Sequence, residues 1–224
     1  MRVFVDLDYL RRIKEREGLA MLMHDRRFLD AQKLFFDVVR NLGGAVDFDI
    51  ADMHEVHAVA ALATHAKGMK VLDLGCGSSE EYVLEDTFRD RYPPFFAEML
   101  ACLGATVTGV DIRPQVNAGY DHRVLDLTDP AWVGDMERPY DVIACFSLFN
   151  APESPFEHDA ALCDRIMDDM RGLLAPEGVV VANLRDELFA ASANEAGAKS
   201  YVERRGFDLL HIDGNCAWLS LSPA

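Results

Sequence analysis

The sequence predicts an α/β protein whose doubly wound, mostly parallel sheet of seven strands ends in an antiparallel hairpin and follows a helical N-terminal cap. From residue 69 onward, short apolar runs alternate with amphipathic segments, and glycine or aspartate follows several of the runs. Such alternation implies crossover connections and a parallel sheet that is covered by helices on both faces. Gly214-Asn215 separates the last two runs, as the turn of a hairpin does. We therefore expect a cap over residues 1–68 and an α/β domain over 69–224.

Three helices are expected in the cap, because apolar residues recur there at intervals of three and four. They cover about residues 8–17, 28–42 and 53–67. A glycine follows each segment, which is a common way for a helix to end.

Seven apolar runs account for the strands of the sheet, since buried parallel strands are nearly continuous in apolar residues. Pro93-Pro94 precedes a helix at the place where a first helical turn accepts proline. The expected strands lie at about 70–74, 106–111, 122–126, 140–146, 179–184, 207–213 and 216–222, and the expected helices at about 95–103, 159–174 and 197–205.

The charge of the chain limits its partners. It has 22 basic and 38 acidic residues among 224, which gives a net charge of −16. Such a charge repels nucleic acid phosphates and anionic membrane surfaces. We therefore expect neither a nucleic acid nor a membrane as partner.

Cellular location follows from the apolar runs and the cysteines. No apolar run reaches the roughly 18 residues that a spanning helix needs. Asp6 and Asp8 interrupt the stretch that would be apolar in a secretory signal. The five cysteines are spread widely and form no Cys-x-x-Cys pair, as in a cytoplasmic protein with reduced, mostly buried thiols.

The residues after the strands are candidates for ligand binding, because ligands of such sheets bind at the carboxyl ends of the strands. Gly75 and Gly77 follow the first strand and let a ligand approach the backbone closely. Asp111 ends the second strand, where one carboxylate can accept hydrogen bonds from both hydroxyls of a ribose. Asp126 and residues 145–147 end the third and fourth strands.

Taken in order, these segments resemble the class I S-adenosylmethionine-dependent methyltransferases, which have a Rossmann-like fold. The resemblance covers about residues 69–222 and includes the terminal hairpin of that family. The matching segments are VLDLGCG (71–77), VTGVD (107–111), VLDLTD (124–129), YDVIACFSLFN (140–150) and LLAPEGVVVANL (173–184).

The resemblance implies S-adenosylmethionine as cofactor and assigns its methionine part to the first loop. Asp73 would bind the ammonium group of the cofactor, either through the loop or through a water. Leu74, Gly75, Cys76 and Gly77 would line the loop itself.

The adenosine part would bind after the second and third strands. Asp111 would take the ribose hydroxyls, and Ile112 would pack on one face of the adenine. Asp126 would accept from the adenine amino group, with Leu127 on the other face. The residues expected near the transferred methyl group are Cys145, Phe146 and Ser147.

Three features depart from the family pattern. Ser79 stands where the family usually has a third glycine. An extra stretch, residues 80–94, precedes the next helix, and we expect it to form a mobile flap over the cofactor. Only 13 residues separate Asp111 from Val124, so the helix usually found between them is expected to be short or replaced by a loop.

The implied reaction is an in-line displacement at the sulfonium methyl group by an O, N, S or C atom of the acceptor. His158 is the candidate general base, and Asn150 is a candidate for orienting the acceptor. A small-molecule acceptor is expected, with a protein acceptor second. The sequence says nothing about the oligomeric state.

Two other functions compete with this interpretation. One is a non-catalytic protein of the same fold that binds or senses S-adenosylmethionine. The other is an oxidoreductase that binds a nicotinamide dinucleotide, whose fingerprint requires Gly or Ala where this chain has Glu80.

Two further patterns carry weaker alternatives. VFVDLD (3–8) is similar to the nucleophile strand of haloacid dehalogenase-like phosphatases but lacks their threonine, so a short strand or a helix start is expected. His54, His57 and His65 share one side of the third expected helix, as metal ligands would. Histidines on a packed helix are the commoner case, and we expect no metal site.

Overall fold

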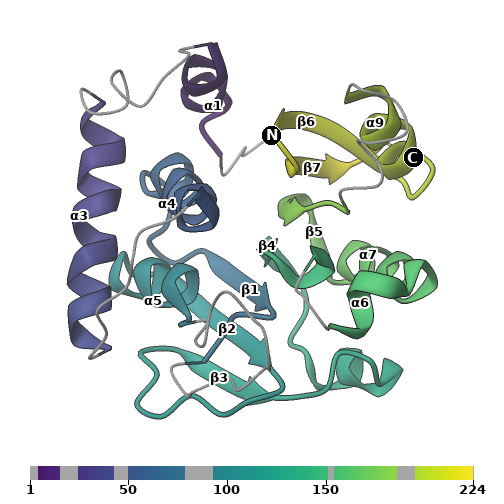
Figure 1. Ribbon diagram of the computed structural model, residues 1–224, viewed down its shortest axis with the longest axis horizontal. Helices are drawn as coiled ribbons and strands as arrows, with labels where there is room; N and C mark the ends of the chain where they lie inside the picture. Colours follow the sequence, from purple (N-terminus) through teal and green to yellow (C-terminus); the bar gives the residue numbers. More distant parts are fainter. Residues whose placement is uncertain are drawn as a thin grey trace.

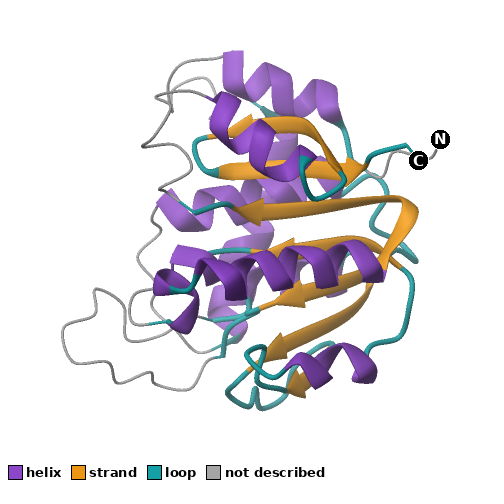
Figure 2. Ribbon diagram, turned by 90° about the vertical axis from the view of Figure 1, so that its right-hand side faces the viewer, coloured by secondary structure: helices purple, strands orange, loops and turns teal. Residues whose placement is uncertain are grey.

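A seven-stranded sheet with helices on both faces forms the centre of the protein (Figures 1 and 2). The computed structural model describes residues 5–15, 25–42, 50–78, 93–150, 154–185 and 195–223. The strand order is β3-β2-β1-β4-β5-β7-β6, and β7 runs antiparallel to both of its neighbours. The predicted fold class is therefore confirmed. The strands are β1 (Lys70–Leu74), β2 (Thr106–Asp111), β3 (Asp121–Val124), β4 (Tyr140–Cys145), β5 (Leu174–Asn183), β6 (Phe207–Asp213) and β7 (Cys216–Leu221).

Two hydrophobic clusters lie on opposite faces of the sheet. Successive side chains of a strand point to opposite faces, and along β5 Val179 and Val181 belong to one cluster while Val180 and Ala182 belong to the other. The first cluster is covered by α1 (Leu7–Glu15), α3 (Arg26–Asn41), α4 (Ile50–Leu62) and α5 (Phe95–Cys102). The second is covered by α6 (Pro155–His158), α7 (Ala160–Leu173), α9 (Glu195–Glu203) and the 3-10 helices η1 (Pro130–Asp135) and η2 (Leu148–Asn150).

The three N-terminal helices lie close to their predicted positions. Val59 and Leu62 of α4 are fully buried in the same cluster as Val71 of the sheet, so α4 forms part of the helix layer. Asp25 caps α3 by accepting hydrogen bonds from the backbone N–H groups of residues 27 and 28. The division of the chain into a cap and an α/β domain stays a prediction.

Asp6, the aspartate of the phosphatase-like segment VFVDLD (3–8), lies at the start of α1. Asp6 accepts a hydrogen bond from the backbone N–H of Tyr9 at 2.9 Å and forms an ion pair with Arg27. Both interactions hold the first turn of α1, so the aspartate that resembled a nucleophile belongs to a helix start.

The connection from β2 to β3 contains no helix. Residues 112–120 form turns and bends, and β3 then pairs with β2 in parallel, with Thr108 opposite Asp121. The short spacing in the sequence predicted this loop, and the prediction is confirmed. The strand itself is shorter than expected and ends at Val124.

The boundary between α7 and β5 was predicted wrongly. The helix ends at Leu173 and the strand begins at once with Leu174, whereas the strand was expected to begin only at about residue 179. Leu174 pairs with Tyr140, and the register then shifts before Val142 pairs with Val179. This irregularity admits a proline and a glycine into the strand.

The described helices include none that is long and apolar enough to cross a membrane. Ser79 and most of the expected flap, residues 80–94, lie outside the described residues. Pro93 and Pro94 are described and directly precede α5, as predicted.

Candidate active site

The candidate site lies along the edge of the sheet where the parallel strands end. Because β7 runs in the opposite direction, its first residue, Cys216, lies at the same edge as the last residues of β1, β2, β4 and β5 (Figure 1). The N-terminal end of α4 also approaches this edge, since His54 contacts Asn183 at the end of β5.

The loop after β1 depends on its glycines. Gly75 and Gly77 have φ values of +67° and +91°, which side-chain-bearing residues rarely adopt. The backbone N–H groups of Gly75 and Cys76 both donate to the carbonyl oxygen of Val110, at 2.8 and 3.1 Å. A Cβ on Gly75 would lie 3.1 Å from Leu148 Cδ1, so this loop also requires close packing.

Asp111 fixes the same loop from the end of β2. Its Oδ2 accepts a hydrogen bond from the Gly77 N–H at 3.0 Å. Its Oδ1 accepts from the backbone N–H of Arg113 at 3.0 Å, and the Arg113 Nε lies 3.4 Å away. A carboxylate has acceptor sites beyond these, so Asp111 can still bind hydroxyl groups. Ile112 follows it and is 63% exposed, as a platform for an adenine would be in the absence of ligand.

Asp73 is the most unusual titratable group of the site. Its side chain is only 2% exposed, on the face of the sheet that α5 covers. Burial, together with the nearby Asp111 carboxylate, raises the pKa of Asp73 to about 8, although a backbone hydrogen bond from Ala97 opposes the shift. A cation at this place would favour the ionised form of Asp73.

Cys76 is held by two residues that sequence reasoning missed. Its Sγ lies 3.7 Å from both Tyr120 Oη and His122 Nδ1, and the latter two atoms are 3.2 Å apart. The His122 Nε2 lies 2.9 Å from the carbonyl oxygen of Arg113. Burial raises the pKa of the Cys76 thiol well above its ordinary value. The short β2–β3 connection was the signal in the sequence, because it brings Tyr120 back toward the loop.

Asp126 and Leu127 lie beyond the end of β3. Asp126 is exposed and accepts hydrogen bonds from both the N–H and the hydroxyl of Thr128, at 2.8 and 2.7 Å. Leu127 is buried in the cluster on the α7 face, and Arg165 of α7 donates to its carbonyl oxygen. The backbone at this position is therefore fixed while the Asp126 carboxylate faces solvent.

The three residues after β4 differ in their surroundings. Cys145 is fully buried among residues of the α7 face, so only its backbone can reach the edge of the sheet. Phe146 packs on the other face against Phe96, with ring centroids 5.1 Å apart. Ser147 has a φ of +57°, and its N–H donates to the side-chain oxygen of Asn183 at 3.2 Å.

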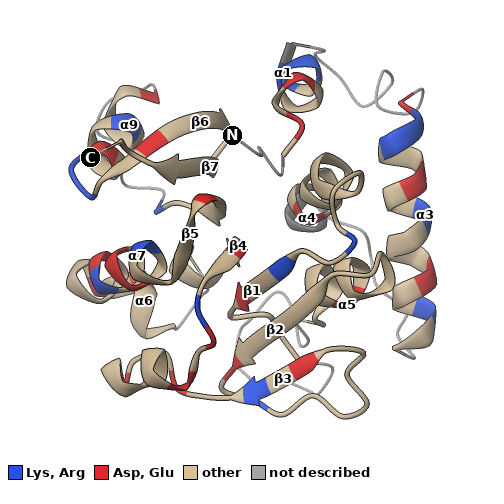
Figure 3. Ribbon diagram, turned by 180° about the vertical axis from the view of Figure 1, so that it is seen from behind, with Lys and Arg blue, Asp and Glu red and all other residues tan. Residues whose placement is uncertain are grey.

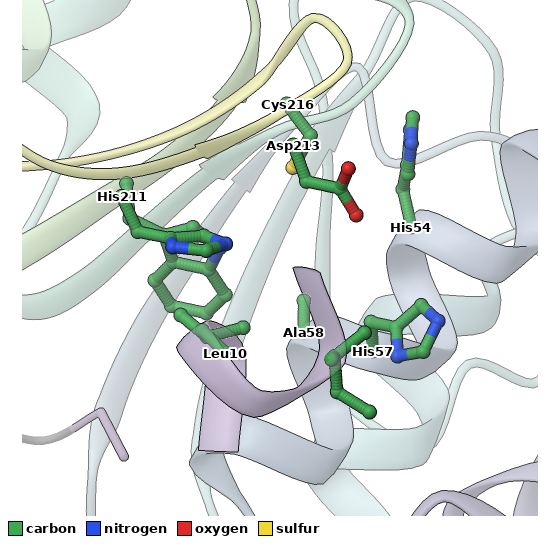
Figure 4. Close-up of a pocket in the computed structure, with 9 residues that line it drawn as sticks. Leu10, His54, His57, Ala58, His211, Asp213 and Cys216 are labelled. Carbon is green, nitrogen blue, oxygen red and sulfur yellow. The ribbon is translucent and has the colours of Figure 1, made fainter. Parts of the chain in front are cut away.

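A small pocket lies between α1, α4 and the β6–β7 hairpin (Figure 4). We call it the histidine pocket; its polar lining consists of His54, His57, His211, Asp213 and Cys216. Its volume of about 20 Å³ is enough for one water-sized group. Figure 4 shows the Asp213 carboxylate extending toward the space between the two histidines of α4.

The predicted alignment of three histidines on one helix is wrong. Helix α4 ends at Leu62, and His65 lies in the exposed turn that follows, where its N–H donates to the Leu62 carbonyl oxygen at 2.9 Å. His54 and His57 line the pocket instead. Within the described part of the chain, no group of three or more His, Cys, Asp or Glu side chains is arranged to hold a metal ion.

The candidate general base, His158, and the candidate for orienting the acceptor, Asn150, lie apart from the pocket. His158 ends α6 with its side chain 81% exposed, next to Glu157 at 3.4 Å. The Asn150 side chain donates to the carbonyl oxygen of Leu184 at 3.0 Å, which ties η2 to the end of β5. Asn150 thus supports the turn after β5, and neither residue lines the histidine pocket.

The site residues fit S-adenosylmethionine. Gly75 and Gly77 give the loop after β1 a backbone conformation that side-chain-bearing residues rarely adopt, and Asp111 offers acceptor sites to hydroxyl groups. Ile112 presents an exposed apolar face, and Asp73 places a buried carboxyl group where a cation would be favourable. Together with the strand order and the reversed β7, these features define the class I methyltransferases.

Comparisons with known proteins agree with this class. The sequence matches the family described as "Methyltransferase domain" over residues 51–212, well over half of the chain. The chain therefore belongs to this family and is an S-adenosylmethionine-dependent methyltransferase. This family match excludes the alternative of a nicotinamide-dependent oxidoreductase. No curated protein matches the sequence.

Solved structures share the fold at low sequence identity. A TehB-like methyltransferase from Corynebacterium glutamicum is 16% identical with a TM-score of 0.50, over 87% of this chain and 99% of that one. The 1,6-didemethyltoxoflavin-N1-methyltransferase of Burkholderia thailandensis is 11% identical with a TM-score of 0.51, over 88% and 89%. MycE, from the mycinamycin biosynthetic pathway, is 13% identical with a TM-score of 0.57, over 89% of this chain and 55% of that one.

Proposed function

We propose that this methyltransferase acts on a small-molecule acceptor and holds its cofactor with the residues that follow the strands. Asp111 would accept hydrogen bonds from the ribose, and Ile112 would pack on the adenine. Asp126 would accept from the adenine amino group. Asp73 and the loop of residues 75–77 would bind the methionine part.

The chemistry then needs alignment more than reactive side chains. S-adenosylmethionine, when bound, supplies an electrophilic methyl group on its sulfonium. The chain would hold the acceptor in line and exclude water, and such alignment can lower a barrier by up to ~7–11 kcal/mol. The turn at Ser147, which Asn183 supports at 3.2 Å, would give the methyl end of the cleft a fixed backbone.

The observation that best supports the proposal of a small-molecule acceptor is the histidine pocket. Its wall is joined to the Ser147 turn through His54 and Asn183, and it admits only a group about the size of a water, which suits one functional group of a small compound. The acidic chain, with Lys and Arg dispersed over several elements (Figure 3), agrees with this and argues against nucleic acid. Two solved structures of similar fold are complexes with 1,6-didemethyltoxoflavin and with mycinamycin VI, both small molecules. The five cysteines are free, as suits an enzyme of the reducing cytoplasm.

The experiment combines cofactor binding with product detection. S-adenosylhomocysteine should raise the melting temperature, whereas NAD should not; ligand at about 100 times its Kd adds ~2.7 kcal/mol of stability. The enzyme and S-adenosylmethionine are then incubated with separate small-molecule and protein fractions of a cell extract, and products heavier by one CH₂ group are sought by mass spectrometry.

Methylated product in the small-molecule fraction supports the proposal, and product in the protein fraction alone contradicts it. Cofactor binding without product in either fraction would favour the non-catalytic alternative. Absence of stabilisation by S-adenosylhomocysteine would contradict the cofactor site itself.

A further inference from the structure

The histidine pocket is connected directly to the cofactor edge of the sheet. His54 Nδ1 lies 3.2 Å from the side-chain nitrogen of Asn183, and the side-chain oxygen of Asn183 accepts from the Ser147 N–H. Two hydrogen bonds therefore join the wall of the pocket to the turn after β4. None of the residues that line the pocket belongs to those that fit the cofactor.

The same bonds fix which nitrogen of His54 carries its proton. A backbone N–H can only donate, so the Asn183 atom that faces Ser147 is the oxygen. The Asn183 nitrogen then donates both to His54 Nδ1 and to the side-chain oxygen of Asn215, 2.8 Å away. His54 Nδ1 is an acceptor, and the proton of the neutral ring is on Nε2.

Asp213 is the charged residue of the pocket lining, and Lys14 and Arg11 act on His211 from outside the lining. Burial lowers the pKa of His54 and of His211, and it lowers that of His57 to about 4. The three imidazoles are therefore neutral near pH 7. His54 already uses its lone pair in the bond from Asn183, so acceptor nitrogens for an occupant come from His57 and His211. The thiol of Cys216 is also uncharged, because burial raises its pKa to about 12. A carboxylate among neutral rings makes the polar lining net negative.

The shape of the pocket sets the size of its occupant. Leu10 of α1, Ala58 of α4 and Trp218 of β7 form an apolar wall. The space of about 20 Å³ holds one water-sized group, and a primary ammonium group has that size. An ammonium has three donors, which match a carboxylate and neutral imidazole nitrogens, whereas an anion would face Asp213.

We propose that the histidine pocket binds a primary amino group of the methyl acceptor, with Asp213 as its charged partner and His57 and His211 as neutral neighbours. The acceptor is thus an amine-bearing small molecule, which rests on the proposed function and narrows its substrate class. The net charge of −16 favours the approach of such a cation.

The test uses the intact enzyme saturated with S-adenosylhomocysteine and labelled with ¹³C at the histidine rings. Three small probes of different charge are added in turn: ethylammonium, ethanol and acetate. Ethylammonium should shift the ring signals of His54, His57 and His211, and should leave the exposed His65 unchanged. Acetate should shift none of the three, and ethanol should bind more weakly than ethylammonium.

Variants then test the charged partner. Asp213→Asn should weaken ethylammonium binding by about 10-fold or more, because this is the usual contribution of a hydrogen bond between charged groups to affinity. Asp208→Asn is the matched control on the same strand, since Asp208 accepts from the Ser222 hydroxyl outside the pocket, and it should bind the probe as the wild type does. Melting temperatures of both variants show whether they fold.

Several results would overturn the proposal, and the wild-type data alone suffice for the first two. One is that no probe moves the pocket histidines, in which case the pocket holds only water. Another is that acetate or ethanol shifts them as strongly as ethylammonium. The third is that folded Asp213→Asn binds ethylammonium unchanged. None of these requires turnover, so methylated product together with a failed probe test would contradict this inference and leave the proposed function standing.

Discussion

His54 of α4 accepts a hydrogen bond from Asn183 at the end of β5, with 3.2 Å between His54 Nδ1 and the Asn183 side-chain nitrogen. The same amide supports Ser147, whose φ of +57° is uncommon for a residue other than glycine. One amide thus connects the N-terminal helix layer with the turn after β4. His54 can keep this bond only while its Nδ1 is unprotonated.

Replacing Asn183 with aspartate should weaken the preference of His54 for the neutral form. The carboxylate of Asn183→Asp can accept from Ser147 but cannot donate to His54, so His54 must donate from a protonated Nδ1. An adjacent carboxylate should raise the pKa of His54 by about one pH unit or more. NMR titration of the ring signals measures this, with His211 as a control whose pKa should change little. An unchanged pKa of His54 would show that the bond to Asn183 does not determine its protonation.

Asp73 should make the stability of the enzyme fall as the pH rises. Its pKa is about 8 in the folded protein and near 3.8 in the unfolded chain, so between these values the folded state binds the additional proton. The free energy of unfolding therefore decreases through this range, by about 2–4 kcal/mol between pH 5 and 8. Urea unfolding at both pH values should show the loss in the wild type and a smaller loss in Asp73→Asn. Equal losses in the two proteins would assign the effect to other groups.

Cofactor binding should release a proton from Asp73. The ammonium group of the methionine part favours the ionised carboxylate, so it lowers the pKa of Asp73 from about 8 toward its ordinary range. Titration calorimetry at pH 7 in two buffers with different enthalpies of ionisation measures the protons released. The wild type should show a binding enthalpy that depends on the buffer, and Asp73→Asn should not. Binding without proton release in the wild type would place the ammonium group elsewhere.

The main features of the fold could be read from the sequence because they depend on local patterns. Each strand is an apolar run, and the loop between β2 and β3 followed from the number of residues available. The extension of β5 to Leu174 could not be predicted in this way. It depends on pairing with Tyr140, 34 residues earlier in the chain, and on an irregular register that no periodicity indicates.

The candidate site was predictable only where its residues follow strands. The glycines and Asp111 have positions set by the topology, so spacing sufficed. The histidine pocket combines α4 with β6, and its key contact joins His54 to Asn183 across 129 residues. Such contacts depend on how the layers pack. Counting along a helix placed His54 with His65, and the structure places it with Asp213.

Asp111→Asn should weaken cofactor binding while the fold persists. An asparagine keeps one oxygen that can accept from the Gly77 N–H, but it lacks the charge that strengthens hydrogen bonds to hydroxyl groups. We expect the affinity for S-adenosylhomocysteine to fall by about 10-fold or more in titration calorimetry. Asp121→Asn is the control, because Asp121 pairs with Arg123 on an exposed part of β3. Equal affinities of the two variants would remove Asp111 from the cofactor site.

Gly109 of β2 should prove necessary for the residues that hold Cys76. A Cβ at this position would lie 2.4 Å from Tyr120 Cε2 and 2.9 Å from Cys76 Sγ, so Gly109→Ala must displace both side chains. Overpacking of this kind costs about 1–3 kcal/mol. Because Cys76 belongs to the loop after β1, the affinity for S-adenosylhomocysteine should fall as well.

A double-mutant cycle separates this effect from a general loss of packing. Tyr120→Ala removes the ring that the new methyl group would strike, so the Gly109→Ala/Tyr120→Ala protein should be more stable than the sum of the two single changes predicts. Chemical unfolding of the four proteins measures the coupling. Gly172→Ala is the control, since no atom lies within 4 Å of its added Cβ and alanine stabilises the interior of a helix such as α7. Additive losses in the cycle would mean that Gly109 does not act through Tyr120, because the strain against the ring disappears when the ring is removed, although the contact with Cys76 Sγ remains.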